Sequence, residues 1–453
     1  MTPRALRRSA RLSPTGPALV PHNSDGEWSE RLEWLPWGLF VFLYLPLIYW
    51  SGLTLKPTQV IDFPGIYLGP RLAFVHHATP YGYAAFDDFA LAWDRWIAPF
   101  VYPPPSLIAL WPLSLFSIDT AFILFTIVSH LCLLGTVWLI LRKLIPLPER
   151  KAVRTLVVSV CLTYIVLSDS VAATLNLGQI NIITTFFICL SVTALIENQA
   201  AWRVAWPLSI AILLKTYPVL LILLLLVRRR FRAAALTSAF CAVFVVVALW
   251  VLPGEIWTSW LTEVLPAAGS ASATAKLFSH SKVSFVWDQS ITGFLTRLIG
   301  HAYSPLFRPK LVAPLARIVT LVMTGVTAWV SLRAGRTPDD TAAFLLLMYL
   351  IAPVSWDHHL VFILPAAALT IVLILNGSVK GKWLPVMLLL ALCLIAWRMN
   401  LERPILEKGW WSLLASLKFF SVLGLWLFFV RRLHGSRNGG SGALVGPSRS
   451  CPV

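Results

Sequence analysis

Residues 341–375 read TAAFLLLMYLIAPVSWDHHLVFILPAAALTIVLIL, two uncharged runs separated by a polar cluster. The cluster is Ser355-Trp356-Asp357-His358-His359, and the runs cover residues 341–354 and 360–375. A carboxylate and two imidazoles are costly at a membrane surface, so they are rarely kept there without a function. The stretch therefore predicts two membrane helices joined by a functional polar turn.

The composition of the whole chain indicates that the bilayer is its solvent. Of 453 residues, 58% are hydrophobic and 13% are charged, and the mean hydropathy is +0.75, which excludes a water-soluble globule. A spanning helix needs about 20 mostly apolar residues. Such stretches recur at about residues 35–52, 119–141, 153–168, 180–197, 233–252, 312–332, 340–353, 358–376, 383–398 and 410–430.

The fold class predicted from this pattern is an all-α integral membrane protein without a soluble domain. We expect a multi-helix bundle of about 10–13 transmembrane helices, some of them broken or re-entrant. Residues 35–432 form the predicted membrane body. Residues 1–34 and 433–453 are predicted to be disordered cytoplasmic tails, because both are polar and the second is rich in Gly, Ser and Arg.

Basic residues predict the orientation, because they stay on the cytoplasmic side of membrane proteins. The formal charge of +17 is therefore a topology signal and gives no reason to expect a nucleic-acid partner. The rule predicts a multi-pass protein of the cell membrane, with residues 53–104, 169–179, 253–311 and 354–358 on the outer side of the membrane. The basic clusters are Arg4 to Arg11, Arg142 to Arg154, Arg228 to Arg232, Arg333 with Arg336, Lys380 with Lys382, and Arg431 with Arg432.

Residues 203–228 cannot be one spanning helix, because a single crossing would place the Arg228 cluster outside. The chain must enter and return, with its turn at Lys215-Thr216-Tyr217-Pro218. At 1.5 Å per residue the arm before the turn rises about 16 Å, roughly to mid-bilayer. Residues 102–116 are also too few to span. Broken helices at membrane depth are tolerated only beside protein or a wet cavity, which predicts an active site reached from the membrane.

The polar residues on the predicted outer face suit sugar transfer from a lipid phosphate. Such a reaction needs a base near the acceptor hydroxyl and cations or hydrogen-bond donors near the departing phosphate. Asp87 or Asp88 is the candidate base, and His358, His359, Lys215 and Arg297 are candidates to stabilise the phosphate. The six scattered cysteines indicate neither disulfides nor a metal site, and we predict no cofactor. A lipid or sugar transporter or flippase is the alternative, since transporters also place charges and broken helices around a cavity.

Six short motifs in order resemble the polyprenol-phosphate-mannose-dependent mannosyltransferases of the GT-C class, the PimE type. The resemblance extends from about residue 35 to 430. The motifs are Asp88-Phe89, Tyr102-Pro103-Pro104, Leu177-Gly178-Gln179-Ile180-Asn181, Leu214-Lys215-Thr216-Tyr217-Pro218, Asp288-Gln289-Ser290-Ile291-Thr292-Gly293 with Arg297, and Pro353-Val354-Ser355-Trp356-Asp357-His358-His359. Two departures are the Asp87-Asp88 doublet and Asp288, where the family leads us to expect Asn.

The resemblance implies an inverting hexosyltransferase with its active site on the outer face. The donor is a polyprenyl-phosphate sugar, most simply mannose, and the acceptor is a glycolipid or glycan hydroxyl. The first-loop base maps onto Asp88, with Asp87 as its neighbour, and His358 or His359 holds the phosphate or the acceptor. The expected substrate-binding residues are Lys215, Tyr102, Gln179, Asn181, Gln289, Arg297, Trp356 and Asp357.

Several of these residues have structural alternatives. Lys215 also suits snorkelling toward the headgroups, and the amides of Gln179 and Asn181 also suit structural hydrogen bonding in the outer loop. Asp357 is expected to orient a histidine rather than to react.

Overall fold

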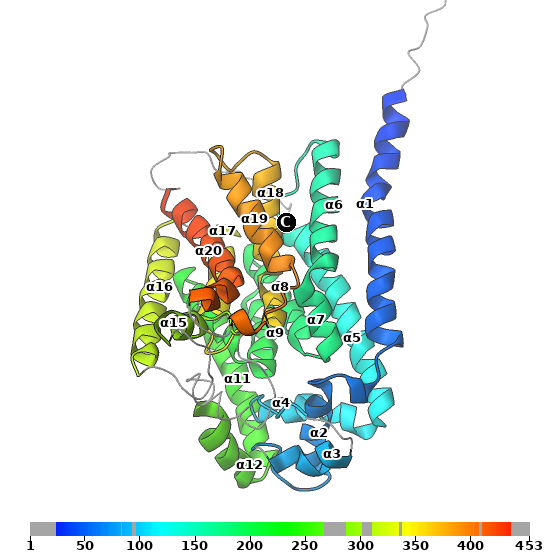
Figure 1. The fold of residues 1–453 in the computed structure, drawn as a ribbon, viewed down its shortest axis with the longest axis vertical. Helices are drawn as coiled ribbons and strands as arrows, with labels where there is room; N and C mark the ends of the chain where they lie inside the picture. The colour runs from blue at the N-terminus through cyan, green and yellow to red at the C-terminus, as the bar shows by residue number, and fades with distance from the viewer. Residues whose placement is uncertain are drawn as a thin grey trace, which may run out of the picture.

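The structure is a computed structural model that describes residues 24–82, 84–92, 97–266, 287–300, 310–334, 338–401, 403–406 and 410–435. Within these ranges all regular elements are helical (Figure 1). Seven helical segments in the described part are long and apolar enough to span a membrane, and shorter apolar helices accompany them. The predicted all-α, multi-pass fold class is confirmed.

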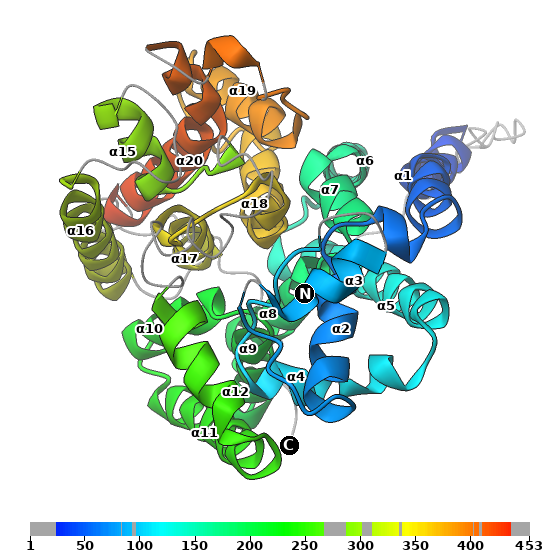
Figure 2. The same ribbon diagram turned by 60° about the horizontal axis from the view of Figure 1, so that its bottom comes forward.

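The amino-terminal part of the chain supplies the helices of one side of the bundle. A long α1 lies at its edge beside α6 in both views (Figures 1 and 2). Helix α1 begins upstream of the predicted membrane body, and residues 1–23 of the predicted tail lie outside the described residues. The elements are α1 (Ser24–Ile48), α2 (Phe63–Phe74), α3 (Asp87–Ala92), α4 (Pro105–Leu110), α5 (Ile118–Leu139), α6 (Lys151–Leu167), α7 (Asp169–Leu177), α8 (Asn181–Ile196), α9 (Ala201–Leu214), α10 (Leu220–Val227), α11 (Phe231–Val251) and α12 (Gly254–Ser259).

The carboxyl-terminal part supplies the other side, in which α20 packs against α16, α17 and α19 (Figure 2). Residues 436–453, most of the second predicted tail, lie outside the described residues. The elements are α15 (Ile291–Gly300), α16 (Val312–Ala334), α17 (Pro338–Ile351), the 3-10 segment Asp357–Ile363, α18 (Leu364–Leu375), α19 (Leu384–Ala396), the 3-10 segment Trp410–Ser416 and α20 (Leu417–Gly435).

The segment that follows the polar cluster lies at the centre of the bundle. In the apolar window of Asp357–Leu375, 89% of the residues are buried, against 22% in the window of Trp34–Ser51 in α1. The 3-10 segment Asp357–Ile363 packs against α7 and α8 on one side and against α17 on the other. It therefore joins the two sides of the bundle, and its polar residues are enclosed by protein.

The helix break predicted at Lys215 is present. Helix α9 ends at Leu214, Lys215 is extended with a φ of −154°, and Pro218 lies in the 3-10 turn Tyr217–Val219 before α10. The chain also returns to the end from which it came, because Arg230 Nη2 donates to the Gln199 carbonyl, just before α9, at 2.7 Å. The in-and-out path inferred from the basic clusters is therefore confirmed.

Ion pairs gather at the end of the bundle that carries the basic clusters. Arg228, after α10, pairs with Asp340 of α17 and donates to the Thr341 hydroxyl at 2.8 Å. Arg432 of α20 pairs with Asp339 at 3.0 Å. At the opposite end, Asp62 N donates to the Leu177 carbonyl, and Gln289 N donates to the Ser355 carbonyl. The loops predicted to lie outside thus meet at one end.

The buried Arg228–Asp340 pair is expected to stabilise this end strongly. Arg228→Met leaves the Asp340 carboxylate buried without its cation, which costs about 3–5 kcal/mol of stability. The measurement is thermal unfolding of the purified protein in detergent. Arg232→Met, at an exposed position four residues further along the chain, is the matched control and should unfold near the wild-type temperature. Equal unfolding temperatures for the two variants would contradict the role given to the pair.

Candidate active site

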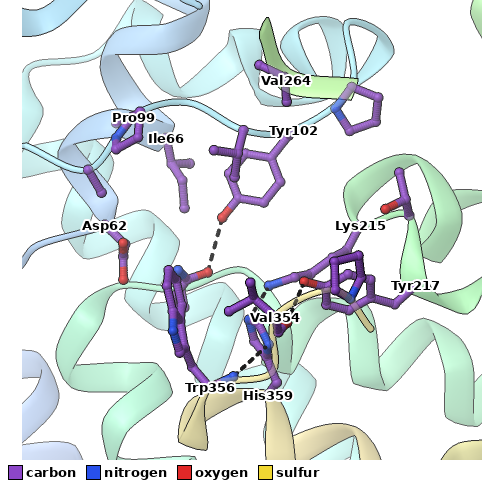
Figure 3. A pocket seen from close by; sticks show the side chains of 17 residues that line it. Asp62, Ile66, Pro99, Tyr102, Lys215, Tyr217, Val264, Val354, Trp356 and His359 are labelled. Atoms are coloured by element: carbon purple, nitrogen blue, oxygen red, sulfur yellow. Dashed lines mark hydrogen bonds between the residues drawn. The ribbon is translucent and has the colours of Figure 1, made fainter. Parts of the chain in front are cut away.

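A pocket of about 120 Å³ lies where the loops of the two sides meet. One wall comes from the start of α2 and from residues 98–103, and the other from residues 215–217 and 353–359. Figure 3 shows Asp62 and Lys215 on opposite sides of this space, with Tyr102 above and His359 below. The helix break at Lys215 and the polar turn after α17 therefore open into one cavity.

Asp62 supplies the carboxylate of the pocket. It directly precedes α2, its side chain makes no capping bond, and Figure 3 shows the carboxylate facing the cavity. Burial raises the pKa of Asp62 to about 6, although a hydrogen bond to Gln179 and the charge of Lys215 act in the opposite direction. A carboxyl group with this pKa is ionised at neutral pH and remains basic enough to accept a proton.

Lys215 is the cation that faces this carboxylate. Its Nζ lies 2.8 Å from His359 Nε2 and donates to Asn181 Oδ1 at 2.8 Å. The rings of Tyr217 and Phe362 lie within 6 Å of the ammonium and enclose it. Since three elements hold this side chain inside the protein, Lys215 does not snorkel to the headgroups.

Tyrosine hydroxyls fix the walls of the pocket. Tyr102 donates to Gln179 Oε1 at 3.1 Å, and Tyr81 donates to the Tyr102 carbonyl at 2.8 Å. On the other wall, Tyr217 donates to the Val354 carbonyl at 3.1 Å. Tyr102 and Gln179, which were predicted to bind substrate, thus line the cavity in contact with each other, and Gln179 also reaches Asp62.

The two histidines of the polar turn have different surroundings. His359 lines the pocket, and its Nδ1 lies 3.3 Å from the backbone nitrogen of Trp356. His358 is buried beside it, and its backbone carbonyl accepts from the Thr174 hydroxyl and from Asn181 Nδ2. Its Nε2 has no hydrogen-bond partner among the described residues. The geometry therefore favours His359 over His358 for contact with a substrate.

Asp357 pairs with a cation rather than orienting a histidine. Lys418 of α20 is fully buried, and its Nζ lies 2.7 Å from Asp357 Oδ2 and 3.8 Å from Asp169 Oδ2. The lysine therefore ties α20 and α7 to the polar turn. The sequence analysis did not single out Lys418, whose position in an apolar segment, Ser416-Leu417-Lys418-Phe419, is the signal that points to it.

Gln289 and Arg297 are buried in the scaffold behind the polar turn, and neither is a lining residue of the pocket. Gln289 bonds the backbone of Ala415 and Phe419, at 2.7 and 3.1 Å. Arg297 donates to the Asp288 carbonyl at 2.6 Å and to the Ser416 hydroxyl at 2.7 Å. These contacts hold α15 and the segment before it against the start of α20, and Gln289 N donates to the Ser355 carbonyl of the polar turn.

Asp87 and Asp88 do not line the pocket. They begin α3, and both side chains are exposed. The lining carboxylate of the described residues is Asp62, which the sequence analysis passed over. A signal was present, because Asp62-Phe63 is an Asp-Phe pair in the same loop as Asp88-Phe89 and lies closer to the first apolar segment. Spacing alone did not distinguish the two pairs.

Much of the remaining lining is apolar and comes from several separate segments, namely Ile66, Ala98, Pro99, Val101, Val264, Pro353 and Val354. Among the described residues, no group of three or more His, Cys, Asp or Glu side chains is placed to hold a metal ion. The pocket lining offers one carboxylate, one lysine, one histidine and hydroxyl groups around a partly apolar space.

Comparison with known proteins places the chain among membrane glycosyltransferases. The model of glycosyltransferase family 87 matches residues 100–355, more than half of the chain. A polyprenol-phosphate-mannose-dependent alpha-(1-2)-phosphatidylinositol mannoside mannosyltransferase of Mycolicibacterium smegmatis is 25% identical over 86% of this chain and 85% of its own length. The corresponding phosphatidylinositol pentamannoside mannosyltransferase of that species is 24% identical over 90% of this chain and 94% of its own length. The phosphatidylinositol pentamannoside mannosyltransferase of Mycobacterium tuberculosis is 25% identical over 70% of this chain and 67% of its own length.

The position of Asp62 depends on Gly178, which ends α7 in the left-handed conformation with a φ of 68°. A Cβ on Gly178 would lie 2.5 Å from the Cβ of Phe63, the neighbour of Asp62. Gly178→Ala should therefore displace Phe63 and cost more than the roughly 1–2 kcal/mol of the backbone conformation alone. Thermal unfolding in detergent measures this cost.

Gly377 offers a matched control. Its φ is 67°, and an added Cβ would meet nothing within 4 Å. Gly377→Ala carries the backbone cost without the clash. If the two variants unfold at the same temperature, the close approach of Phe63 to Gly178 does not constrain the site.

Proposed function

Because the chain belongs to glycosyltransferase family 87, we propose that it moves a mannosyl residue from a polyprenyl-phosphate carrier to a hydroxyl group of a glycolipid. The activities for which the relatives are named support this donor, and the acceptors in those names are phosphatidylinositol mannosides. The family match favours sugar transfer over the transporter alternative. The observation that carries the proposal is the single pocket in which a carboxylate with a raised pKa faces a Lys–His pair.

In the proposed reaction Asp62 is the general base, in place of Asp88. The acceptor hydroxyl gives its proton to the Asp62 carboxylate while its oxygen attacks the anomeric carbon of the donor. The bond between that carbon and the phosphate oxygen breaks, and polyprenyl phosphate leaves with the electron pair. A single displacement of this kind inverts the anomeric configuration.

Lys215 and His359 suit the departing phosphate. They lie across the cavity from Asp62, so attack and departure take place on opposite sides of the sugar (Figure 3). A phosphate that leaves as a stable anion needs charge stabilisation more than protonation, and a lysine held inside the protein supplies it. Asn181 fixes the Lys215 ammonium at 2.8 Å and acts as a positioning residue. Trp356 and Tyr102 line the remaining space and offer ring faces to the sugar.

The pocket is proposed to open on the extracytoplasmic face of the cell membrane. Its loops gather at the end of the bundle opposite the arginine-rich ion pairs. Basic residues favour the cytoplasmic side, which supports a position of Asp62 and Lys215 near the outer leaflet. A lipid donor can reach such a site from within the bilayer.

Replacing the proposed base tests the mechanism directly. Asp62→Asn keeps the size and hydrogen-bonding shape of the side chain but removes its basicity, so transfer should fall by about 10²–10⁴-fold. The assay is formation of labelled glycolipid from labelled polyprenyl-phosphate mannose and a phosphatidylinositol mannoside acceptor, with the purified protein in detergent. Asp88→Asn is the matched control and should keep transfer within about threefold of wild type. Full turnover in the Asp62 variant together with loss in the Asp88 variant would restore the sequence-based assignment.

The pKa of Asp62 predicts an acid limb in the pH profile. The base must be ionised, and burial raises its pKa to about 6, so kcat/KM should fall about tenfold per unit as pH drops below 6. Lys215, His359 and Tyr102 face Asp62, and Lys215 stays cationic through the acid limb. Initial rates at subsaturating donor between pH 4.5 and 7.5 measure the profile. A kcat/KM that is flat between pH 5 and 7 would exclude Asp62 as the titrating base.

A further inference from the structure

A second pocket, of about 240 Å³, lies at the end of the bundle opposite the candidate active site. It is formed where three apolar spans begin or end: Trp34–Ser51, Ile118–Leu144 and Lys151–Leu177. In Figure 1 these are α1, α5 and α6, at the outer edge of the bundle. The ends of spanning helices lie at the depth of lipid headgroups, so the pocket is open to that layer.

The lining of this pocket is divided by polarity. Leu141, Leu147 and Val158 line the apolar part together with Pro36, and Trp37 adds the amphipathic ring that is typical of the interface. The polar part has three basic side chains, and no acidic residue is among the described residues of the lining. Such a surface matches a molecule with an anionic head and an apolar body.

The three cations are Arg142, Lys151 and Arg154, all of them exposed. Two backbone carbonyls fix Arg154, because its Nε donates to Pro148 at 3.0 Å and its Nη2 donates to Glu149 at 3.3 Å. An arginine has five N–H donors in a planar fork, so these two bonds leave it able to bind a phosphate oxygen. The two bonds therefore hold the Arg154 guanidinium at the pocket before a ligand binds.

We propose that this pocket binds the phosphate of an anionic phospholipid of the leaflet that faces the basic clusters. Basic pockets between membrane helices recognise such headgroups. The amino tail of the chain does not complement the pocket, because Arg4, Arg7, Arg8 and Arg11 make it basic. The bound lipid would bridge α1, which lies at the edge of the bundle, to α5 and α6. This inference does not depend on the transferase reaction.

Native mass spectrometry of the full-length protein in detergent tests the proposal. Dioleoyl phosphatidylglycerol should bind as a resolved adduct, and dioleoyl phosphatidylcholine should bind much more weakly. The triple variant Arg142→Gln, Lys151→Gln, Arg154→Gln should bind phosphatidylglycerol on the order of 100-fold more weakly. A second variant, Thr155→Glu, adds a carboxylate to the lining without removing a cation and should also lose the adduct.

The matched control removes the same charge elsewhere at this end of the bundle. Arg229→Gln, Arg232→Gln, Lys380→Gln replaces three exposed cations outside the pocket and should retain binding. Equal loss in both triple variants would mean that the general surface charge attracts the lipid, which overturns the proposal. Equal binding of both lipids, or displacement of the adduct by millimolar inorganic phosphate, would overturn it as well. Thermal unfolding of each variant establishes that it is folded.

Discussion

The burial of one ammonium group organises the centre of this molecule. Lys215 lies where α9 breaks, and a cation at that depth is stable only if polar groups enclose it. Asn181 of α8 and His359 of the polar turn meet it at 2.8 Å, and Asp62 faces it across the cavity. Lys215 and these three partners come from four separate segments, so satisfying one charge fixes how those segments converge. The pocket is the space that this convergence leaves.

In the bundle around this centre, the residues that support the polar turn are different from those that line the cavity. Arg297 and Gln289 bind backbone groups behind the polar turn, and Lys418 neutralises Asp357 from α20. None of the three lines the cavity. Motif residues of both kinds are needed for the same site, because a loop that carries a histidine at membrane depth must have its own polar groups satisfied. A motif therefore indicates involvement in a site without telling whether a side chain touches the substrate.

Much of the fold could be predicted from the sequence, because the bilayer imposes strong rules on length and charge. The apolar stretches, the return path through Lys215 and the gathering of basic residues at one end followed from helix length and the sidedness of arginine. The site was predicted in part. Lys215, Tyr102, Gln179 and His359 converge in the pocket. The two Asp-Phe pairs of the first loop could not be told apart, because Asp62 is held at the cavity by tertiary contacts, namely the close approach of Phe63 to Gly178 and the bond from Asp62 N to the Leu177 carbonyl.

The apolar part of the pocket lining has a consequence for the fate of an activated sugar. Water is a competing nucleophile for any glycosyl donor, and it is far more abundant than a glycolipid. Ile66, Val264 and Val354 offer water no hydrogen bonds, so stray molecules gain little by occupying the space beside the sugar. In the proposed reaction, an acceptor that enters with its own lipid body would fill this space as its hydroxyl reaches Asp62. Selection against wasteful hydrolysis can thus rest on hydrocarbon side chains that take no part in bond making.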